Sequence, residues 1–148
     1  MTEVKFGSYS FKREERNGME FIFDEVRKKW VVLTPEEWVR QHILHHLIHD
    51  KGFPKSLIAV ERGIELNGLQ KRFDIAVFAT DGQAKMVIEC KAPEEKLDQK
   101  VFEQIARYNL SLRVDYLWVT NGALNFCCRL KNRIEMLEQI PTVDEINQ

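Results

Sequence analysis

Two acidic residues and a lysine, Asp74, Glu89 and Lys91, occupy two segments of the sequence that have the composition of β-strands. Residues 73–78 and 86–91 are rich in apolar and β-branched side chains, and an Asp-Gly pair between them is typical of a hairpin turn. Carboxylates and a lysine on paired strands are groups that can hold a metal ion and a phosphate. These three residues are therefore the first candidates for a functional site.

The register of this hairpin decides whether the two carboxylates meet. A two-residue turn at 81–82 sets Asp74 directly opposite Glu89, and a symmetric four-residue loop keeps that pairing, whereas a β-bulge shifts it. The two-residue period of a strand places Glu89 and Lys91 on one face, and Cys90 with its apolar neighbours on the other.

Like charges directly opposite in a hairpin lie roughly 5 Å apart at Cβ and destabilise the pair, so they require a counter-charge. Sharing a proton and pairing with Lys91 are two solutions. We favour a third, a hard divalent cation such as Mg²⁺, which prefers oxygen ligands. The alternative is that Asp74, Glu89 and Lys91 are ordinary charges on solvent-facing strands, since Glu-x-Lys also arises by chance.

The bulk properties describe one globular domain with a sizeable core. The chain has 148 residues, a hydrophobic fraction of 44%, a charged fraction of 30% and a formal net charge of −1. Any phosphate-binding surface would therefore be local rather than a global basic field. Cys90, Cys127 and Cys128 form no CxxC motif and no even disulfide framework, which fits a cytoplasmic protein. We expect no membrane partner, because no apolar run approaches the roughly 18 residues of a span.

Residues 34–50 carry the signals of a helix. Thr34 is the expected N-cap, a proline takes the first helical position, Glu37 completes a capping box, and a glycine follows the end. At 100° per residue, Glu36 and Arg40 fall within the apolar face, and Glu37 lies at its edge. An inward carboxylate needs a partner, which gives Glu36 more interest than a favourable charge at a helix N-terminus.

Four histidines of this helix have the i, i+3, i+4, i+7 spacing that is compatible with zinc ligands: His42, His45, His46 and His49. They lie opposite the apolar face, and the helix adds no acidic or cysteine ligand that would strengthen a zinc site. We therefore interpret them, together with Trp38, as a solvent-facing or interface stripe.

A second hairpin precedes the first one. Residues 57–66 predict a strand that leads through an Asn-Gly turn into the strand containing Asp74. With a two-residue turn, Glu61 lies opposite Asp74, on the side away from Glu89. Because long hairpins often contain bulges, we treat Glu61 as an outer carboxylate of the site.

The remaining sequence predicts a helix over residues 97–112, in which Gln104 and Tyr108 are neighbours at i, i+4. They are either polar residues at the edge of the core or groups that orient water and phosphate. Residues 116–120 and 124–130 predict two further strands, and residues 133–139 predict a short closing helix.

From residue 34 onward the elements follow an α-β-β-β-α-β-β order. A three-strand meander with a helical crossover predicts an α/β fold with a mixed central β-sheet flanked by helices. Residues 34–148 form this core, and residues 1–33 predict an N-terminal β-hairpin extension of the same domain. The charges of residues 1–33 are nearly balanced, which favours a solvated appendage over an arm that binds nucleic acid. The extension could equally cover a sheet edge or pair with a second copy of the chain.

This ordered set of motifs resembles the PD-(D/E)XK nuclease superfamily, and more closely the N-terminal nuclease domain of type I restriction enzyme R subunits. The matching pieces span roughly residues 34–122 and are TPEEWVRQ, RFDIAVF, VIECKAP, QIARY and YLWVTNG. Glu-x-Lys alone is weakly specific, whereas the whole set in the expected elements is much more so. The resemblance implies a restriction-endonuclease-like fold and metal-dependent cleavage of DNA.

The resemblance also implies roles for individual residues. Asp74 and Glu89 would ligate Mg²⁺ or Mn²⁺, with help from the backbone carbonyl of Cys90. Lys91 would position or activate the attacking water and stabilise charge on the phosphate. Such a site is chemically consistent, because phosphodiester hydrolysis needs a nucleophilic water, a neutralised phosphate and a stabilised leaving oxygen.

Three more positions follow from the same resemblance. Glu36 would complete the acidic site from the first helix. Gln104 and Tyr108 would supply the motif on the second helix, Gln104 as a catalytic residue and Tyr108 as a contact to the substrate. The superfamily's proline before the first acid is missing, since Arg72-Phe73 precede Asp74. This departure removes no metal ligand.

The sequence contains no GxxxxGK[S/T] loop, so we expect no helicase motor of the kind that type I R subunits carry. DNA is the expected partner, and the domain would act as a homodimer or in a restriction-type multisubunit assembly. The alternative is a non-catalytic DNA-binding or protein-assembly module on the same fold. A third reading, acid–base hydrolysis of a glycoside, is disfavoured by the lysine within the site.

Overall fold

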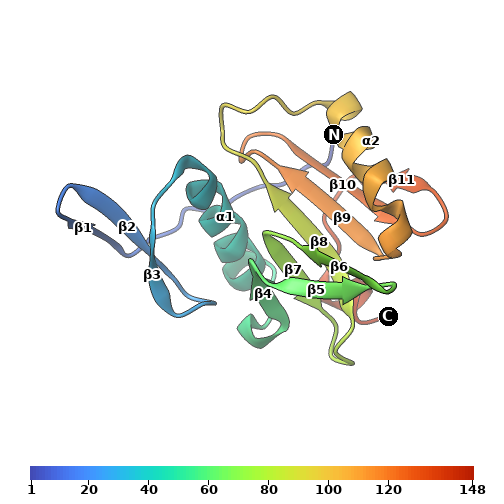
Figure 1. Cartoon of the computed structure of the whole chain (residues 1–148), viewed down its shortest axis with the longest axis horizontal. Coiled ribbons are helices and arrows are strands. Elements are labelled where there is room, and N and C mark those ends of the chain that lie inside the picture. The colour runs from blue at the N-terminus through green and yellow to red at the C-terminus, as the bar shows by residue number, and fades with distance from the viewer.

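A computed structural model describes all residues from 1 to 148 and shows a mixed α/β fold around a six-stranded sheet (Figure 1). The strand order is β11-β10-β9-β8-β7-β4, in which β8 and β9 are parallel and the other neighbours antiparallel. The strands are β4 (Ile58–Val60), β7 (Ile75–Phe78), β8 (Ala84–Cys90), β9 (Tyr116–Thr120), β10 (Asn125–Leu130) and β11 (Ile134–Met136). The predicted mixed central sheet flanked by helices is confirmed.

Two helices pack on opposite faces of this sheet. Helix α1 (Pro35–His45) continues as a π-helix, η1 (His46–Asp50), and α2 (Gln99–Asn109) ends in a 3₁₀ turn, η3 (Leu110–Leu112). Thr34 caps α1 by accepting the N–H of Glu37 at 3.0 Å, and Asp98 caps α2 by accepting the N–H of Val101 at 2.8 Å. No helix is long and apolar enough to cross a membrane.

Strand β8 divides the core between these two helices. Met86, Ile88 and Cys90 point into the cluster that contains the apolar face of α1, whereas Val87 joins the cluster around α2. Glu89 has the same parity as Val87 and therefore lies on the α2 side of the sheet. The predicted separation of Glu89 from Cys90 is confirmed.

The hairpin between β7 and β8 reaches the predicted register by a different route. Its turn spans residues 79–83, with the N–H of Ala79 bonded to the carbonyl of Gln83 at 2.9 Å, and a bulge lies between Val77 and Phe78. The two-residue turn was therefore a wrong prediction. The bulge compensates for the longer loop, so that Ile75 pairs with Ile88 and the next position, Asp74, adjoins Glu89.

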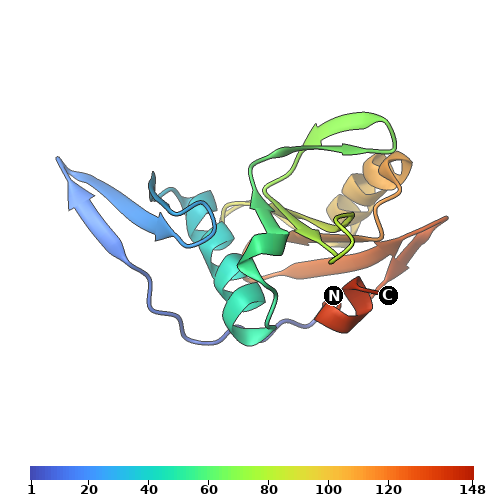
Figure 2. The ribbon, with the colours of Figure 1, turned by 90° about the horizontal axis from the view of Figure 1, so that it is seen from below.

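The strand predicted over residues 57–66 is broken into two. Glu61 has a φ of +51°, which ends β4 and turns the chain into a separate hairpin of β5 (Gly63–Leu66) and β6 (Leu69–Arg72). The predicted register survives the break, because the N–H of Glu61 bonds to the carbonyl of Asp74 at 3.0 Å. Figure 2 shows this hairpin rising from the sheet on the same side as α2.

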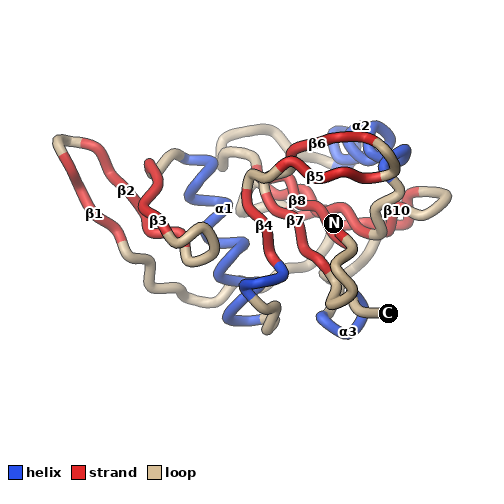
Figure 3. Tube along the Cα trace, turned by 60° about the horizontal axis from the view of Figure 1, so that its bottom comes forward, coloured by secondary structure: helices blue, strands red, loops and turns tan.

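The N-terminal residues form a three-stranded antiparallel sheet in the order β1-β2-β3, which lies beside α1 and away from the central sheet (Figure 3). Its strands are β1 (Arg13–Arg16), β2 (Met19–Asp24) and β3 (Lys29–Val32), and Asn17-Gly18 forms the β1–β2 turn. The extension predicted as a β-hairpin therefore contains a third strand. The residues before β1 contact the core: the hydroxyl of Thr2 donates to the carbonyl of Leu137 at 2.7 Å.

The closing helix predicted over residues 133–139 was wrong. Residues 134–136 form strand β11, which pairs with β10 through Leu130 and Ile134. A tight connection after β10 keeps the chain at the edge of the sheet, and this pairing overrides the local helical pattern. A short helix, α3 (Val143–Ile146), follows near the end of the chain.

Candidate active site

Asp74 lies between β6 and β7, immediately before β7 begins, and next to the end of β8. One carboxylate oxygen, Oδ2, accepts the backbone N–H of Cys90 at 2.7 Å, and the other, Oδ1, accepts from Nη2 of Arg40 at 2.9 Å. The two bonds hold the carboxylate between the sheet and α1. Asp74 therefore occupies a set orientation before any ligand arrives.

Glu89 lies beside Asp74 and is largely buried. Burial raises the pKa of Glu89, and the Asp74 carboxylate acts in the same direction, while Lys71 and Lys91 act against them. Neither lysine is paired with Glu89: Lys71 donates to Oδ1 of Asn109, and Lys91 has another partner. Glu89 thus lies next to a second carboxylate, that of Asp74, with little direct compensation of its own charge.

Lys91 follows β8 at the point where the strand leaves the sheet. Its backbone N–H bonds to the carbonyl of Thr120 on β9 at 2.8 Å, which fixes its position. Its Nζ lies 3.6 Å from Oε2 of Glu95, a half-exposed residue in the loop before α2. This exposed pair is weak, so the ammonium group can exchange partners at little cost.

The first turn of α1 contributes two carboxylates, Glu36 and Glu37. Glu37 is the more buried of the two, whereas the prediction placed Glu36 further inside. Glu37 is 6% exposed, whereas the side chain of Glu36 is 47% exposed. Glu37 is covered because Arg27, in the β2–β3 connection, donates to its Oε1 at 3.0 Å. The carboxylate of Glu37 therefore faces arginines instead of completing a capping box.

Glu36 nevertheless lies on the side of the helix that faces Asp74. Burial and then the charge of Asp74 raise the pKa of Glu36, and Arg40 acts in the opposite direction. The Nη2 of Arg40 lies 3.4 Å from Oε1 of Glu36. The structure thus brings together Glu36, Asp74 and Glu89, the three predicted acids.

Arg40 connects these acids to a buried ionic network that extends into the N-terminal sheet. Its guanidinium is 3% exposed and also contacts Glu37 at 2.8 Å and Glu61 at 3.0 Å. Arg27 pairs with Glu37 and with the fully buried Asp24. Glu61 therefore lies on the Arg40 side of Asp74, as an outer carboxylate.

Helix α2 presents the predicted Gln104 and Tyr108 on its outer face, but only Tyr108 is linked to the acids. Tyr108 is 76% exposed, and the Nζ of Lys71 lies 4.5 Å from the centre of its ring. Lys71 in turn interacts electrostatically with Glu89. Gln104 is exposed, and its side chain forms no hydrogen bond.

Three cations of this region did not enter the predicted site. Arg40 had a signal, because a guanidinium inside an apolar helix face requires carboxylate partners. No signal in the sequence indicated Arg27 or Lys71. The contacts of Arg27 depend on how the N-terminal sheet folds onto α1, and the position of Lys71 depends on the bend at Glu61.

Two histidines of the stripe are buried, which corrects the solvent-facing interpretation for them, whereas His49 is about half exposed. His45 is 5% exposed and His46 is 2% exposed. Residues before β1 cover them: the rings of Phe11 and His45 lie 4.5 Å apart, and those of Phe6 and His46 lie 5.1 Å apart. The opposite face of the helix already packs on the sheet, so α1 is enclosed on two sides.

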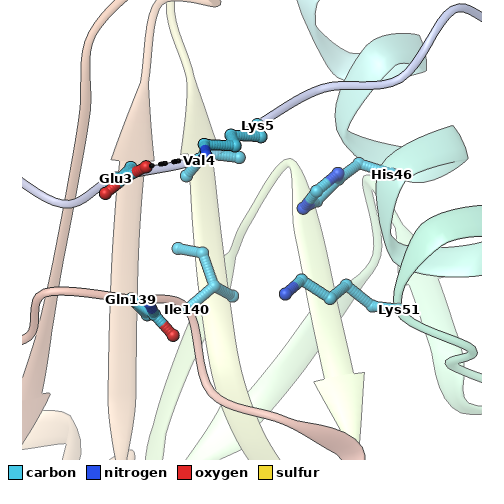
Figure 4. Close-up of a pocket in the computed structure, with 7 residues that line it drawn as sticks. All are labelled: Glu3, Val4, Lys5, His46, Lys51, Gln139 and Ile140. Carbon is cyan, nitrogen blue, oxygen red and sulfur yellow. Dashed lines mark ion pairs between the residues drawn. The ribbon is translucent and has the colours of Figure 1, made fainter.

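A small pocket of about 190 Å³ lies away from the acids, between the N-terminal segment, η1 and the segment before α3 (Figure 4). Its charged and polar lining includes His46, Lys51, and an ion pair of Glu3 with Lys5 at 3.6 Å. No residue of the predicted site lines this pocket.

The donor set of the site fits a hard divalent cation. Asp74 and Glu89 offer carboxylate oxygens side by side, and burial of Glu89 without a paired cation leaves negative charge to be neutralised. The Cys90 thiol points into the opposite core, and burial raises its pKa well above the ordinary value. Cys90 can therefore contribute through its backbone and not through its sulfur.

The fold resembles nuclease-like folds among solved structures. One is a fragment described as an HsdR subunit of a type I restriction enzyme from Vibrio vulnificus YJ016, with a TM-score of 0.55 and 20% identity over 77% of this chain and 24% of that one. Another, from Anabaena variabilis ATCC 29413, is described as a nuclease belonging to DUF820, with a TM-score of 0.46 and 12% identity over 80% and 86%.

Residues 35–141 match the family described as type I restriction enzyme R protein N terminus (HSDR_N). This range covers more than half of the chain, so the protein belongs to that family. The chain spans about a quarter of the length of the Vibrio protein. Among curated proteins, none matches this sequence.

Proposed function

We propose that this protein is a metal-dependent phosphodiesterase that cleaves DNA, with its active site at Asp74, Glu89 and Lys91. The proposal is supported most directly by the placement of Asp74, whose carboxylate is held by the N–H of Cys90 beside the partly buried Glu89. Membership of the HSDR_N family supports the same reaction class.

Asp74 and Glu89 would hold Mg²⁺ or Mn²⁺, together with the backbone carbonyl of Cys90. When bound, such an ion lowers the pKa of water and neutralises charge on a phosphate. The chain's contribution is to keep the two carboxylates adjacent, since the bond from Cys90 fixes the rotamer of Asp74.

The remaining residues of the site position water and phosphate. Lys91 exchanges its weak contact with Glu95 for the scissile phosphate, and orients or helps to deprotonate the attacking water. Glu36, which lies near Asp74, completes the acidic site from α1. Gln104 and Tyr108 on the open face of α2 contact the nucleic-acid backbone, with Lys71 beside Tyr108.

DNA is the proposed substrate, and a restriction-type multisubunit assembly or a homodimer is the proposed context. The family description and the Vibrio fragment both refer to R subunits of type I restriction enzymes, which supports this context. A formal net charge of −1 means that affinity for DNA comes from the local lysines or from a partner subunit.

The test is cleavage of single-stranded and double-stranded DNA by the purified chain in Mg²⁺ or Mn²⁺, with EDTA as the metal-free control. Cleavage should require the metal and disappear in Lys91→Ala. Lys96→Ala is a matched control, because its side chain is exposed in the following loop. Melting curves of both variants show whether they remain folded.

Isothermal titration with Mn²⁺ separates failure of the chemistry from failure of the site. Wild type should bind the ion, and Asp74→Asn should not. Binding without cleavage would favour a non-catalytic DNA-binding or assembly module, and absence of binding by wild type would overturn the proposal.

A further inference from the structure

A second set of potential metal ligands lies outside the proposed active site, where the N-terminal sheet meets the end of α1. The set consists of His45 at the end of α1, His49 in η1, and Glu25 in the β2–β3 connection. One ligand atom from each lies within 4.8 Å of the others. His45 and His49 are spaced i, i+4, so both rings face the same side, and Glu25 supplies the acid that the helix lacks.

The hydrogen bonding of His45 prepares one ring nitrogen for a metal. Its Nδ1 lies 2.9 Å from the carbonyl of Gln41. Because a carbonyl only accepts, Nδ1 carries the hydrogen and Nε2 presents a lone pair. That Nε2 lies 4.0 Å from Oε1 of Glu25. Histidine ligands in metal sites usually have this arrangement, with the other ring nitrogen donating to a carbonyl or carboxylate.

The other two groups close around an ion by side-chain movement and the loss of one proton, because Nε2 of His49 donates to the Glu25 carboxylate and must pass its hydrogen to Nδ1 or to solvent before it can bind a metal. Nε2 of His49 lies 3.1 Å from Oε2 of Glu25, and about half of the His49 side chain is exposed. Tetrahedral zinc ligands at about 2.0 Å from the ion are roughly 3.3 Å apart, so the 3.1 Å between His49 and Glu25 already suits an ion and the 4.0 Å between His45 and Glu25 must shorten. His49 belongs to a π-helix, a rare conformation that is frequent at functional sites.

We infer that Glu25, His45 and His49 form a binding site for a divalent transition-metal ion, of which Zn²⁺ fits the two imidazoles and one carboxylate best. Water completes the coordination on the exposed side. The one cation already near the site is Lys55, whose Nζ lies 3.6 Å from Oε2 of Glu25. Its side chain is about half exposed, so the ion displaces it into solvent.

A bound ion would fasten the N-terminal sheet to the helix. Glu25 lies in the connection between β2 and β3, and both histidines lie in the α1–η1 segment. The same connection carries Arg27, which reaches Glu37 in the first turn of α1. This site is independent of the proposed nuclease activity, since none of its ligands belongs to the acidic site.

The experiment is calorimetric titration of the metal-free full chain with Zn²⁺, in excess Mg²⁺ so that the acids at Asp74 and Glu89 do not compete. His49→Gln and Glu25→Gln each remove one ligand while keeping a polar side chain of similar size. His42→Gln is the matched control: its Nδ1 also lies close to a helix carbonyl, that of Trp38 at 2.7 Å, but it lies outside the ligand set.

One equivalent of Zn²⁺ should bind to wild type and to His42→Gln, and affinity should fall at least tenfold in the two ligand variants. Co²⁺ should give a visible absorption band in the same two proteins, and Zn²⁺ should slow tryptic cleavage at the lysines and arginines of the β1–β3 sheet. Absence of binding by wild type overturns the inference. Equal binding by Glu25→Gln and His49→Gln also overturns it, since the ion would then be held elsewhere.

Discussion

The Nη2 of Arg40 lies 2.9 Å from Oδ1 of Asp74, so the proposed metal-binding carboxylate already has a cation as its partner. The guanidinium comes from a nearly buried side chain and also contacts Glu37 and Glu61. An arginine in this position balances the charge of the acids while the site is empty of substrate. It also holds α1 against the bend in the β6–β7 strand.

Arg40→Gln should lower the free energy of unfolding by about 3 kcal/mol, because it removes the arginine partner of Asp74 and one of the two arginines that pair with the buried Glu37. Chemical denaturation measures the change. Mg²⁺ should raise the melting temperature of this variant more than that of wild type, since the ion would replace the missing counter-charge. A loss below about 1 kcal/mol would mean that the network contributes no more than surface pairs do.

Glu89→Gln should stabilise the fold at neutral pH while abolishing cleavage. Burial holds the pKa of Glu89 above its ordinary value of 4.5, so the native state binds more protons than the unfolded chain between those two pKa values. The stability contributed by Glu89 is fully present below pH 4.5 and is lost as the pH rises through the folded pKa. We expect the free energy of unfolding of the variant to be about 1 kcal/mol higher than that of wild type at neutral pH, a usual size for a single stabilising substitution.

The measurement is chemical denaturation of both proteins in EDTA across the acidic and neutral range. The gain should vanish near pH 4 and shrink when Mg²⁺ is added. Glu94→Gln removes an exposed negative charge from the same region and should show neither trend. A gain independent of pH would show that the ionisation of Glu89 is not its source.

Lys71→Ala should weaken DNA binding without regard to sequence. Lys71 lies between Tyr108 and the acids, so its ammonium group faces the surface over which a phosphate backbone would pass. Loss of one phosphate contact should reduce the slope of log K against log salt by about 0.9. Fluorescence anisotropy over a salt series tests this, with the exposed Lys5→Ala on the opposite face as the control. An unchanged slope would place DNA elsewhere.

Tyr108 should act through its ring. The aromatic face holds the Nζ of Lys71 at 4.5 Å, a contact worth about 0.5–1 kcal/mol at an exposed position. Tyr108→Phe should therefore bind DNA as wild type does, and Tyr108→Ala should resemble Lys71→Ala. If Tyr108→Phe were as weak as Tyr108→Ala, the hydroxyl group and not the cation contact would be the functional part.

The relative placement of the candidate acids could be predicted because strand pairing and turn signals are local. Asn67-Gly68 gave the register that puts Glu61 opposite Asp74, and this register survived the break at Glu61. The β7–β8 register was correct although its turn was not, because apolar residues such as Val77 and Met86 must face one core. Burial on both faces fixes pairing more strongly than turn type does.

The surroundings of α1 could not be predicted in this way. Its histidines seemed solvent-facing because the helix already has one apolar face, yet the residues before β1 cover the other. The partners of Glu37 and Arg40 come from the N-terminal sheet and from the strand break, which no periodicity in α1 reveals. Contacts that polar side chains make between segments far apart in the chain are the hardest to predict from the sequence.

The N-terminal sheet should prove to be part of the same cooperative unit as the site. A chain that begins at Thr34 loses Arg27 and Asp24 from the buried network, and leaves Glu37 and Gln41 without those partners. We expect it to unfold at lower denaturant than the full chain, by about 3 kcal/mol or more. Arg27→Ala in the full chain should reproduce most of this loss, whereas Arg13→Ala, which breaks an exposed pair with Glu20, should cost less than about 1 kcal/mol. Equal stability of the shortened and full chains would instead make residues 1–33 a separate appendage, with the acids held in place by the core alone.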